Sequence, residues 1–300
     1  MIRIQGELDE QSDTSSPTGI ATSFGNSMIT LLDGPLGTEL NRRGVATQLP
    51  SWSAAAVESA PEVIEAIHAD YADAGATVHT ANTFRTKQRT VGNRWQIMTQ
   101  RAVELTRRSV PPNHQVAGSI APLEDCYRPD QSPGVEALPE HLALAEQLAE
   151  AGVDVLLCET FPNPDEALAA VTAARLTKLE TWLALTAGPD ATLMSPEQMA
   201  ITAKQAVDLG AAAILVNCTP AIDTLRFIVA LSDAALGVPI GAYANAGCAD
   251  DHIGWTASPE PGAKTYAKLA NQWIEAGATM VGSCCGTTPE HTRALRNTIS

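Results

Sequence analysis

The chain has 300 residues and a formal net charge of −15, with 45% hydrophobic but only 4% aromatic residues. The acidic balance argues against nucleic acid or an anionic membrane surface as a partner, because both select basic faces. No apolar run approaches the roughly 18–20 residues that a membrane span requires. The composition instead favours helices packed closely on a sheet.

The first 27 residues are rich in Ser, Thr, Asp and Pro and lack the apolar stretch of a secretory signal. We predict a short flexible N-terminal extension over residues 1–27, because this composition cannot bury enough apolar surface to order itself. We expect the protein in the cytoplasm, where its six cysteines stay reduced. The sequence leaves the oligomeric state open and is compatible with a homo-oligomer.

A recurring pattern organises the rest of the chain. It consists of a helix end, a glycine, and a short apolar strand that ends in polar residues, and it occurs at 73–84, 150–161, 208–219 and 275–287. Each glycine fits the left-handed position that ends a helix, and each apolar run fits a strand buried on both faces. Four further strands are predicted at 28–32, 115–120, 181–186 and 238–243.

Helical patterns separate these strands, and proline stands near most of their starts, where its missing N–H does no harm. The helices are expected at 61–74, 94–109, 139–151, 164–178, 196–209, 222–236 and 260–276, with a short one from Pro289. Eight alternations imply right-handed βαβ units and a single (β/α)8 TIM barrel over residues 28–300. An open, doubly wound sheet is the structural alternative.

Polar residues follow the predicted strands at their carboxyl ends, where such barrels carry their active sites. In chain order these are Asp33 and Gly34, Thr80 and Asn82, Ser119, Glu159, Asn217 and Cys218, Asn245, and the pair Cys284–Cys285. The periodicity of the strands and the placement of the polar residues therefore predict one site on one rim of the barrel.

Three cysteines at this rim predict a metal site. Cys218 ends the sixth strand and Cys284 and Cys285 end the eighth, so their sulfurs can meet above the barrel. Zn²⁺ binds thiolates well, and a catalytic zinc site has three protein ligands and one open position. Three thiolates keep the site electron-rich, which favours transfer of a group to sulfur over hydrolysis. The alternative is three buried cysteines that act as small hydrophobic residues.

Several stretches closely resemble the homocysteine S-methyltransferase family. They are LLDGPLGTEL at 31–40, TANTF at 80–84, GSIAP at 118–122, ETFPN at 159–163, VNC at 216–218, YANAG at 243–247 and GSCCGTTPEH at 282–291. The last motif, with VNC upstream, is highly specific, and together the stretches span nearly the whole chain beyond the N-terminal extension.

The resemblance implies that the three rim cysteines hold Zn²⁺ and that the sulfur of homocysteine takes the fourth position. It also implies that Glu159 binds the homocysteine ammonium and that Asp33 and the backbone around Gly34 help to hold the amino acid. Glu159 and Asp33 are the candidate catalytic residues. Asn245 lies where related enzymes place an amide that occupies the zinc when homocysteine is absent.

The methyl donor is less clearly encoded. Thr160 follows Glu159 where betaine-dependent enzymes carry a Tyr, so S-methylmethionine or S-adenosylmethionine is favoured over betaine. Thr80, Asn82 and Ser119 are candidate substrate-binding residues. A cationic donor also suits an aromatic face, for which Trp52, Phe84 and Trp255 are candidates.

Two further cysteines, Cys126 and Cys158, are expected to be structural. Pro35 also departs from the family pattern after Gly34, so one backbone donor to the amino-acid carboxylate is missing or comes from Leu36.

Two other functions stay open at this point. One is a homocysteine-binding module that receives its methyl group from a separate corrinoid protein. The other is a non-catalytic barrel that binds zinc or a thiol.

Overall fold

The structure, a computed structural model, describes residues 29–246 and 259–299. The predicted N-terminal extension, residues 1–27, and the aromatic candidate Trp255 lie outside the described residues. No helix in the described part of the chain is long and apolar enough to cross a membrane.

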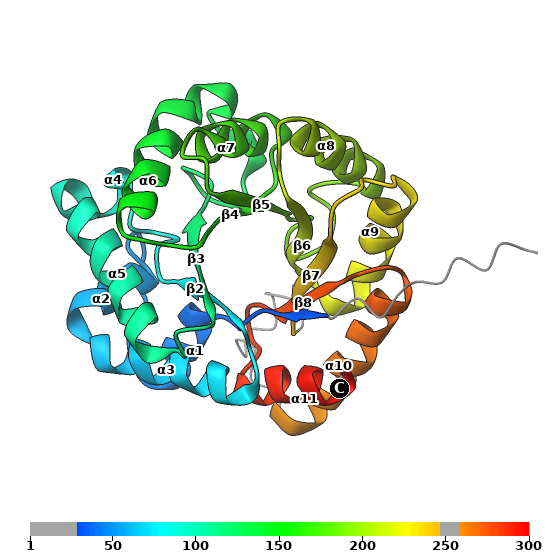
Figure 1. The fold of residues 1–300 in the computed structure, drawn as a ribbon, viewed down its shortest axis with the longest axis horizontal. Coiled ribbons are helices and arrows are strands. Elements are labelled where there is room, and N and C mark those ends of the chain that lie inside the picture. Colours follow the sequence, from blue (N-terminus) through cyan, green and yellow to red (C-terminus); the bar gives the residue numbers. More distant parts are fainter. Residues whose placement is uncertain (1–28, 247–258, 300) are drawn as a thin grey trace, which may run out of the picture.

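Eight parallel strands form the barrel predicted from the sequence, and helices surround them (Figure 1). Each strand pairs with its neighbours in the chain, and β1 pairs with β8. A parallel bridge between Leu32 and Val78 joins the first strand to the second and completes the ring. The strands are β1 Thr30–Leu31, β2 Val78–Ala81, β3 Gln115–Ile120, β4 Val155–Phe161, β5 Glu180–Leu185, β6 Ala213–Pro220, β7 Ile240–Asn245 and β8 Met280–Ser283.

The long helices lie where the sequence predicts them, outside the strands. They are α3 Pro61–Ala74, α5 Trp95–Ser109, α6 Leu138–Glu150, α7 Pro164–Leu176, α8 Pro196–Asp208, α9 Ala221–Asp233, α10 Pro259–Glu275 and α11 Pro289–Ile299. The glycines of the recurring pattern all have a positive φ, as expected for residues that end a helix; they are Gly75, Gly152, Gly210 and Gly277.

Two features of the fold differ from the prediction. Three short helices in the loops after β1 and β2 were not predicted, because they are too short for a periodic pattern; they are α1 Leu36–Arg42, α2 Ala56–Ser59 and α4 Gln88–Val91. Strand β7 begins and ends two residues later than predicted. Its last residues, Ala244 and Asn245, pair with Ser283 and Pro220, and these pairings carry the strand up to the rim.

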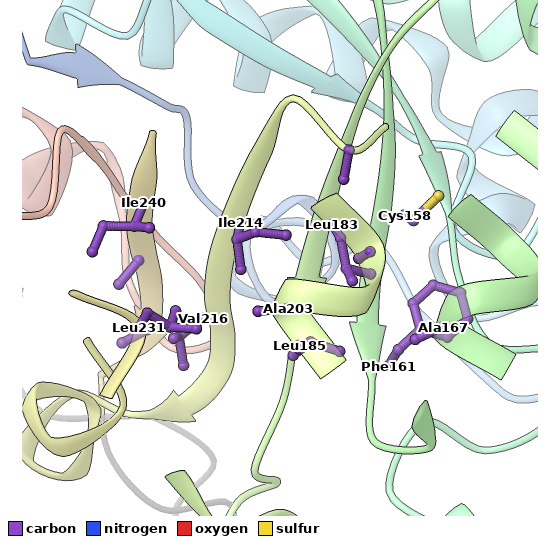
Figure 2. Packing of buried hydrophobic residues seen from close by; sticks show 14 of the residues in the cluster. Cys158, Phe161, Ala167, Leu183, Leu185, Ala203, Ile214, Val216, Leu231 and Ile240 are labelled. Atoms are coloured by element: carbon purple, nitrogen blue, oxygen red, sulfur yellow. The ribbon is translucent and has the colours of Figure 1, made fainter. Parts of the chain in front are cut away.

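Alternate residues of each strand pack into two separate hydrophobic cores, one between the strands and the helices and one inside the barrel. Leu183 and Leu185 of β5 point outward and pack with Ala203 of α8 and with Ile214 and Val216 of β6 (Figure 2). The intervening residues point inward and fill the barrel, among them Trp182, Ala184 and Leu215. Because the interior is packed with side chains, as in other barrels of this kind, space for a ligand is expected at the ends of the strands.

Candidate metal and substrate site

A cavity of about 340 Å³ lies over the carboxyl ends of the strands. Most of the predicted site residues line it: Asp33, Gly34, Thr80, Asn82, Glu159, Cys218, Cys284 and Cys285. Two do not line the cavity but lie directly behind it. Ser119 donates a hydrogen bond to Glu159, and Asn245 is buried next to the cysteine-bearing ends of β6 and β8.

The three rim cysteines converge on one point. The Sγ atoms of Cys218 and Cys284 lie 2.9 Å apart, and all three sulfurs, including that of Cys285, lie within 4.8 Å of one another. These separations exceed the ~2.05 Å of a disulfide bond. A 4.8 Å limit accommodates the roughly 3.8 Å expected between thiolates that bind one tetrahedral zinc ion at about 2.3 Å, whereas the measured 2.9 Å between Cys218 and Cys284 is shorter. The cluster therefore has the size and the chemistry of a three-thiolate metal site.

The local backbone at the end of β6 turns Cys218 into the cavity. The pairing of β6 with β7 shifts register between Asn217 and Pro220, and Cys218 has a φ of 47°. A regular strand would alternate its side chains between the barrel interior and the helices. The irregularity frees Cys218 from that alternation, and a residue with positive φ is held there only by its surroundings.

The same irregularity occurs at the end of β4. Its register with β5 shifts between Cys158 and Phe161, which releases Glu159 and Thr160 from regular pairing, and Thr160 has a φ of 65°. The side-chain amide of Asn217 joins the two strand ends. It donates to Thr160 Oγ1 at 2.7 Å and accepts from the Thr160 amide at 3.1 Å, so one buried amide fixes both breaks.

The end of β8 is fixed by the backbone of β7. The Cys284 amide donates to the Ala244 carbonyl at 2.8 Å, and the Ala246 amide donates to the Cys285 carbonyl at 3.0 Å. Tyr266 of α10 adds a third contact, because its hydroxyl accepts from the Ala244 amide at 2.9 Å and has the carbonyls of Ala244 and Gly282 within reach of its one hydrogen. The adjacent cysteines are thus anchored before any metal binds.

The protonation of the three thiols is strongly coupled. Hydrogen bonds from Cys218 and Cys284 hold the pKa of Cys285 well below its usual range. The neighbouring sulfurs of Cys218 and Cys285, together with burial, raise the pKa of Cys284 well above its usual range. Deprotonation of one thiol therefore disfavours deprotonation of the others. A cation among the three sulfurs would offset the repulsion between thiolates and allow all three to be deprotonated.

Glu159 is a buried carboxylate with two hydrogen-bond donors. Ser119 Oγ donates to Oε1 at 2.5 Å and the Tyr243 hydroxyl donates to Oε2 at 2.9 Å. Burial raises the pKa of Glu159 to about 7 despite these two bonds. A nearby positive charge would favour the carboxylate form, so this group is suited to bind a cation.

Asp33 is the second buried acid of the cavity. Its carboxylate accepts hydrogen bonds from the Thr80 amide at 2.9 Å and the Thr80 hydroxyl at 3.2 Å. Burial nevertheless raises the pKa of Asp33 well above its usual value, and the charge of Glu159 adds to the rise. The adjacent Gly34 has no room for a side chain, because a Cβ there would lie 2.6 Å from the ring of Tyr71.

A second group of potential metal ligands lies beside this acid. Ligand atoms of Asp33, His68 and His79 lie within 4.8 Å of one another. Both histidines are buried, which lowers the pKa of His68 to about 4 and that of His79 to about 3, so both are neutral. His79 lies against His68 of α3 and forms a 3.1 Å hydrogen bond with His114, so it faces the helices, whereas the next residue, Thr80, lines the cavity.

Two predicted amides differ in their surroundings. Asn82 uses its amide nitrogen to donate to the Ser53 carbonyl at 2.8 Å, which supports the loop after β1 as well as the cavity wall. Asn245 is fully buried, and neither side-chain atom has a hydrogen-bond partner among the described residues. A buried amide without partners is unfavourable, so Asn245 is available to a ligand.

Sequence reasoning missed part of the cavity wall. Arg85, Tyr127 and Tyr243 line it, and so does Cys126, which we expected to be structural. Cys126 and Tyr127 come from the irregular loop after β3, where no periodic pattern assigns a direction to the side chains. Tyr243 belongs to the inward-facing series of β7, and its hydroxyl could have been recognised as a site group from that alternation.

The fold and the cysteine cluster define a (β/α)8 barrel with three thiols at its rim that could hold a metal ion. The profile of the homocysteine S-methyltransferase family matches residues 30–299, which is nearly all of the described chain. The chain belongs to the homocysteine S-methyltransferase family and is a methyltransferase acting on a thiol.

Individual relatives agree with this assignment over most of their length. The chain is 32% identical over 301 residues to the homocysteine S-methyltransferase of Escherichia coli K12, covering 89% of this chain and 94% of that protein. It is 29% identical over 309 residues to homocysteine S-methyltransferase 3 of Zea mays, covering 90% of each. Among solved structures, the metallated form of the homocysteine methyltransferase MmuM from E. coli superposes with a TM-score of 0.74 at 26% identity, covering 90% and 96%.

The pairing of Asn217 with Thr160 yields a stability prediction. Replacing Asn217 by Ala leaves the buried Thr160 amide without its acceptor, so the free energy of unfolding should fall by about 1–3 kcal/mol. Urea denaturation of the metal-free protein measures this. Asn271→Ala is the matched control, because it removes a solvent-exposed hydrogen bond to Glu275 and should change stability little. An equal effect of the two variants would contradict the structural role of Asn217.

Proposed function

We propose that this protein transfers a methyl group from a cationic donor, S-methylmethionine or S-adenosylmethionine, to the thiol of homocysteine, forming methionine. The observation that carries the proposal is that three sulfurs within 4.8 Å of one another line the same cavity as the buried carboxylates of Asp33 and Glu159. Such a cavity offers one place for a thiol and another for an ammonium group.

We infer that Cys218, Cys284 and Cys285 hold Zn²⁺. An all-sulfur donor set suits zinc better than magnesium, calcium or manganese, which prefer oxygen ligands. A zinc ion bound there would supply the positive charge that keeps an incoming thiol deprotonated at neutral pH. The related MmuM of E. coli has been solved in a metallated form, which supports a metal in this chain as well. The hydrogen bond from Thr160 Oγ1 to Cys218 Sγ, at 3.8 Å, would stabilise the thiolate form of that ligand.

The buried acids would bind the amino-acid end of homocysteine. Glu159 is held by Ser119 and Tyr243 in a fixed orientation, so its carboxylate is preorganised to receive the ammonium group. Asp33, held by Thr80, would contribute a second negative charge. Close packing at Gly34 against Tyr71 brings the backbone of the loop after β1 to the cavity, where the amino acid can approach it.

The donor would lie against the aromatic part of the wall. Trp52 and Phe84 both line the cavity, and their rings make an edge contact with centroids 5.9 Å apart. Aromatic faces attract cations such as a sulfonium group. Thr80 and Asn82 line the cavity and would bind polar atoms of the substrates. Asn245 lies behind the wall, and its amide, which has no partner among the described residues, would pair with a ligand group that reaches it.

The chemical step is a direct displacement. The thiolate of homocysteine forms a bond to the donor methyl carbon while the bond from that carbon to the donor sulfur breaks. The electron pair of the broken bond stays with the donor sulfur, which leaves as a neutral thioether. The protein needs no general base for this step. Its residues align the two reactants and exclude water, which supplies much of the rate. Because the three thiols must stay reduced, we further expect the protein to act in the cytoplasm.

A methyl-donor screen tests the proposal. With homocysteine as acceptor, the purified protein should form methionine from S-methylmethionine or S-adenosylmethionine alone, and a zinc chelator should abolish the activity. Methionine formation is measured by chromatography, and added Zn²⁺ should restore it. Activity that appears only with a methylated corrinoid protein would identify the protein as a corrinoid-dependent module instead. Absence of activity with every donor, in zinc-loaded protein, would favour a non-catalytic barrel.

Substitution of the cysteines tests the metal assignment. Cys218→Ala, Cys284→Ala and Cys285→Ala should each lose stoichiometric zinc and at least about a hundredfold of activity, because two remaining thiolates form an incomplete site. Elemental analysis of the purified variants measures the zinc. Cys158→Ala is the control, since Cys158 is buried in the helix-facing core and should keep both metal and activity. A rim variant that retains one zinc per chain and full turnover would end the assignment.

Substitution of Glu159 tests the amino-acid site. Glu159→Gln should raise the KM for homocysteine by about ten- to hundredfold, because it removes the charge opposite the ammonium. Burial raises the pKa of Glu159 to about 7, and only the carboxylate form attracts the ammonium, so in the unmodified protein KM should fall as pH rises through 7. This dependence should be absent in Glu159→Gln. Glu146→Gln on the exposed surface of α6 serves as the control and should behave like the parent.

A further inference from the structure

Arg85 is the only basic side chain among the described residues that line the cavity. It follows Phe84 in the loop after β2, and its guanidinium carbon lies 5.5 Å from the centroid of the Phe84 ring. Its Nε atom is buried and has no hydrogen-bond partner within residues 29–246 and 259–299. A buried guanidinium nitrogen without a partner is costly, so the position is suited to an anionic ligand group.

The neighbouring Arg89 differs from Arg85 in its partners. Arg89, four residues further along, forms ion pairs with Glu124 and Glu140 at the surface. The described part of the cavity wall carries the acids Asp33, Asp125 and Glu159, yet none of these three forms an ion pair with Arg85. The positive charge therefore faces a cavity that contains carboxylates but is not neutralised by them.

We infer that Arg85 binds the carboxylate of the methyl donor and thereby selects a donor of the sulfonium amino-acid class. The inference rests on the proposed function. Arg85 shares its part of the wall with Phe84 and Trp52, the aromatic rings against which the sulfonium group would lie. A sulfonium amino acid carries its carboxylate only a few bonds from the charged sulfur, so both ends fit this wall. The planar guanidinium presents paired N–H donors that match a carboxylate.

The carboxylate of homocysteine is chemically identical and must be distinguished from that of the donor. The acceptor is held elsewhere, with its sulfur at the three cysteines and its ammonium at Glu159. The backbone of the loop after β1, which includes Gly34 and Leu36, lies close enough to the cavity to serve its carboxylate. Loss of Arg85 should therefore affect the donor and leave the acceptor nearly unchanged.

Binding of two matched ligands tests the inference. Calorimetry on the metal-loaded protein compares S-methylmethionine with its carboxamide, which keeps the sulfonium and lacks the carboxylate charge. The unmodified protein should bind the carboxamide about ten- to hundredfold more weakly, as expected for loss of a charge-assisted pair. In Arg85→Met this preference should fall to less than about twofold, whereas Arg85→Lys, which keeps the charge but not the paired donors, should retain part of it.

Arg89→Met is the matched control, because it removes the same charge from the same segment outside the cavity and should keep the full preference. The inference is overturned if the unmodified protein binds both ligands equally or not at all, or if Arg85→Met keeps the preference. It is also overturned if Arg85→Met raises the KM for homocysteine instead. Methionine formation by the unmodified protein distinguishes failure of the role assigned to Arg85 from failure of the proposed function. Turnover without a carboxylate preference refutes the role of Arg85 alone, and no turnover refutes the proposed function.

Discussion

The site depends on two breaks in strand pairing that are joined by one amide. Regular parallel pairing would direct alternate side chains of β4 and β6 to the barrel interior and to the helices. The register shift in β6 turns Cys218 to the rim, and the shift in β4 begins beside Glu159, which itself continues the inward series of Val155 and Leu157. Asn217 bonds to Thr160 in both directions and so holds the two breaks together. The barrel provides a rigid frame, and the breaks aim its reactive groups.

Charge explains how the parts of the site work together. The cavity collects three thiols and two buried carboxylates, and burial raises the pKa of both acids. Such a site is complete only with positive partners. A divalent metal, an amino-acid ammonium and a sulfonium donor would supply them, and each belongs to the proposed reaction. Arg85 is the single cationic side chain of the described cavity wall, and it is placed to bind the carboxylate, the one anionic group of the donor.

Features of the fold that repeat along the chain were predictable from the sequence. Buried parallel strands and their helices were predictable because apolar runs, helix-ending glycines and helix-starting prolines repeat along the chain. The short helices α1, α2 and α4 and the exact reach of β7 were not, because they depend on contacts between loops. The place of Cys126 on the cavity wall was not predictable for the same reason: its loop after β3 has no periodicity, and only the packing of that loop places it there.

The sequence by itself determined that eight strands alternate with helices and that polar residues, including three cysteines, follow the carboxyl ends of those strands. The alternation of strands and helices along the chain depends on local sequence patterns, so it can be predicted from the sequence. Only the tertiary structure decided that the sheet closes into a barrel, through the pairing of β1 with β8 and the bridge between Leu32 and Val78. The tertiary structure alone decided that the sulfurs of Cys218, Cys284 and Cys285 lie within 4.8 Å of one another, and that Arg85 faces the cavity while Arg89 pairs at the surface. Those outcomes depend on register shifts and loop packing, because contacts between residues far apart in the chain determine where their side chains point.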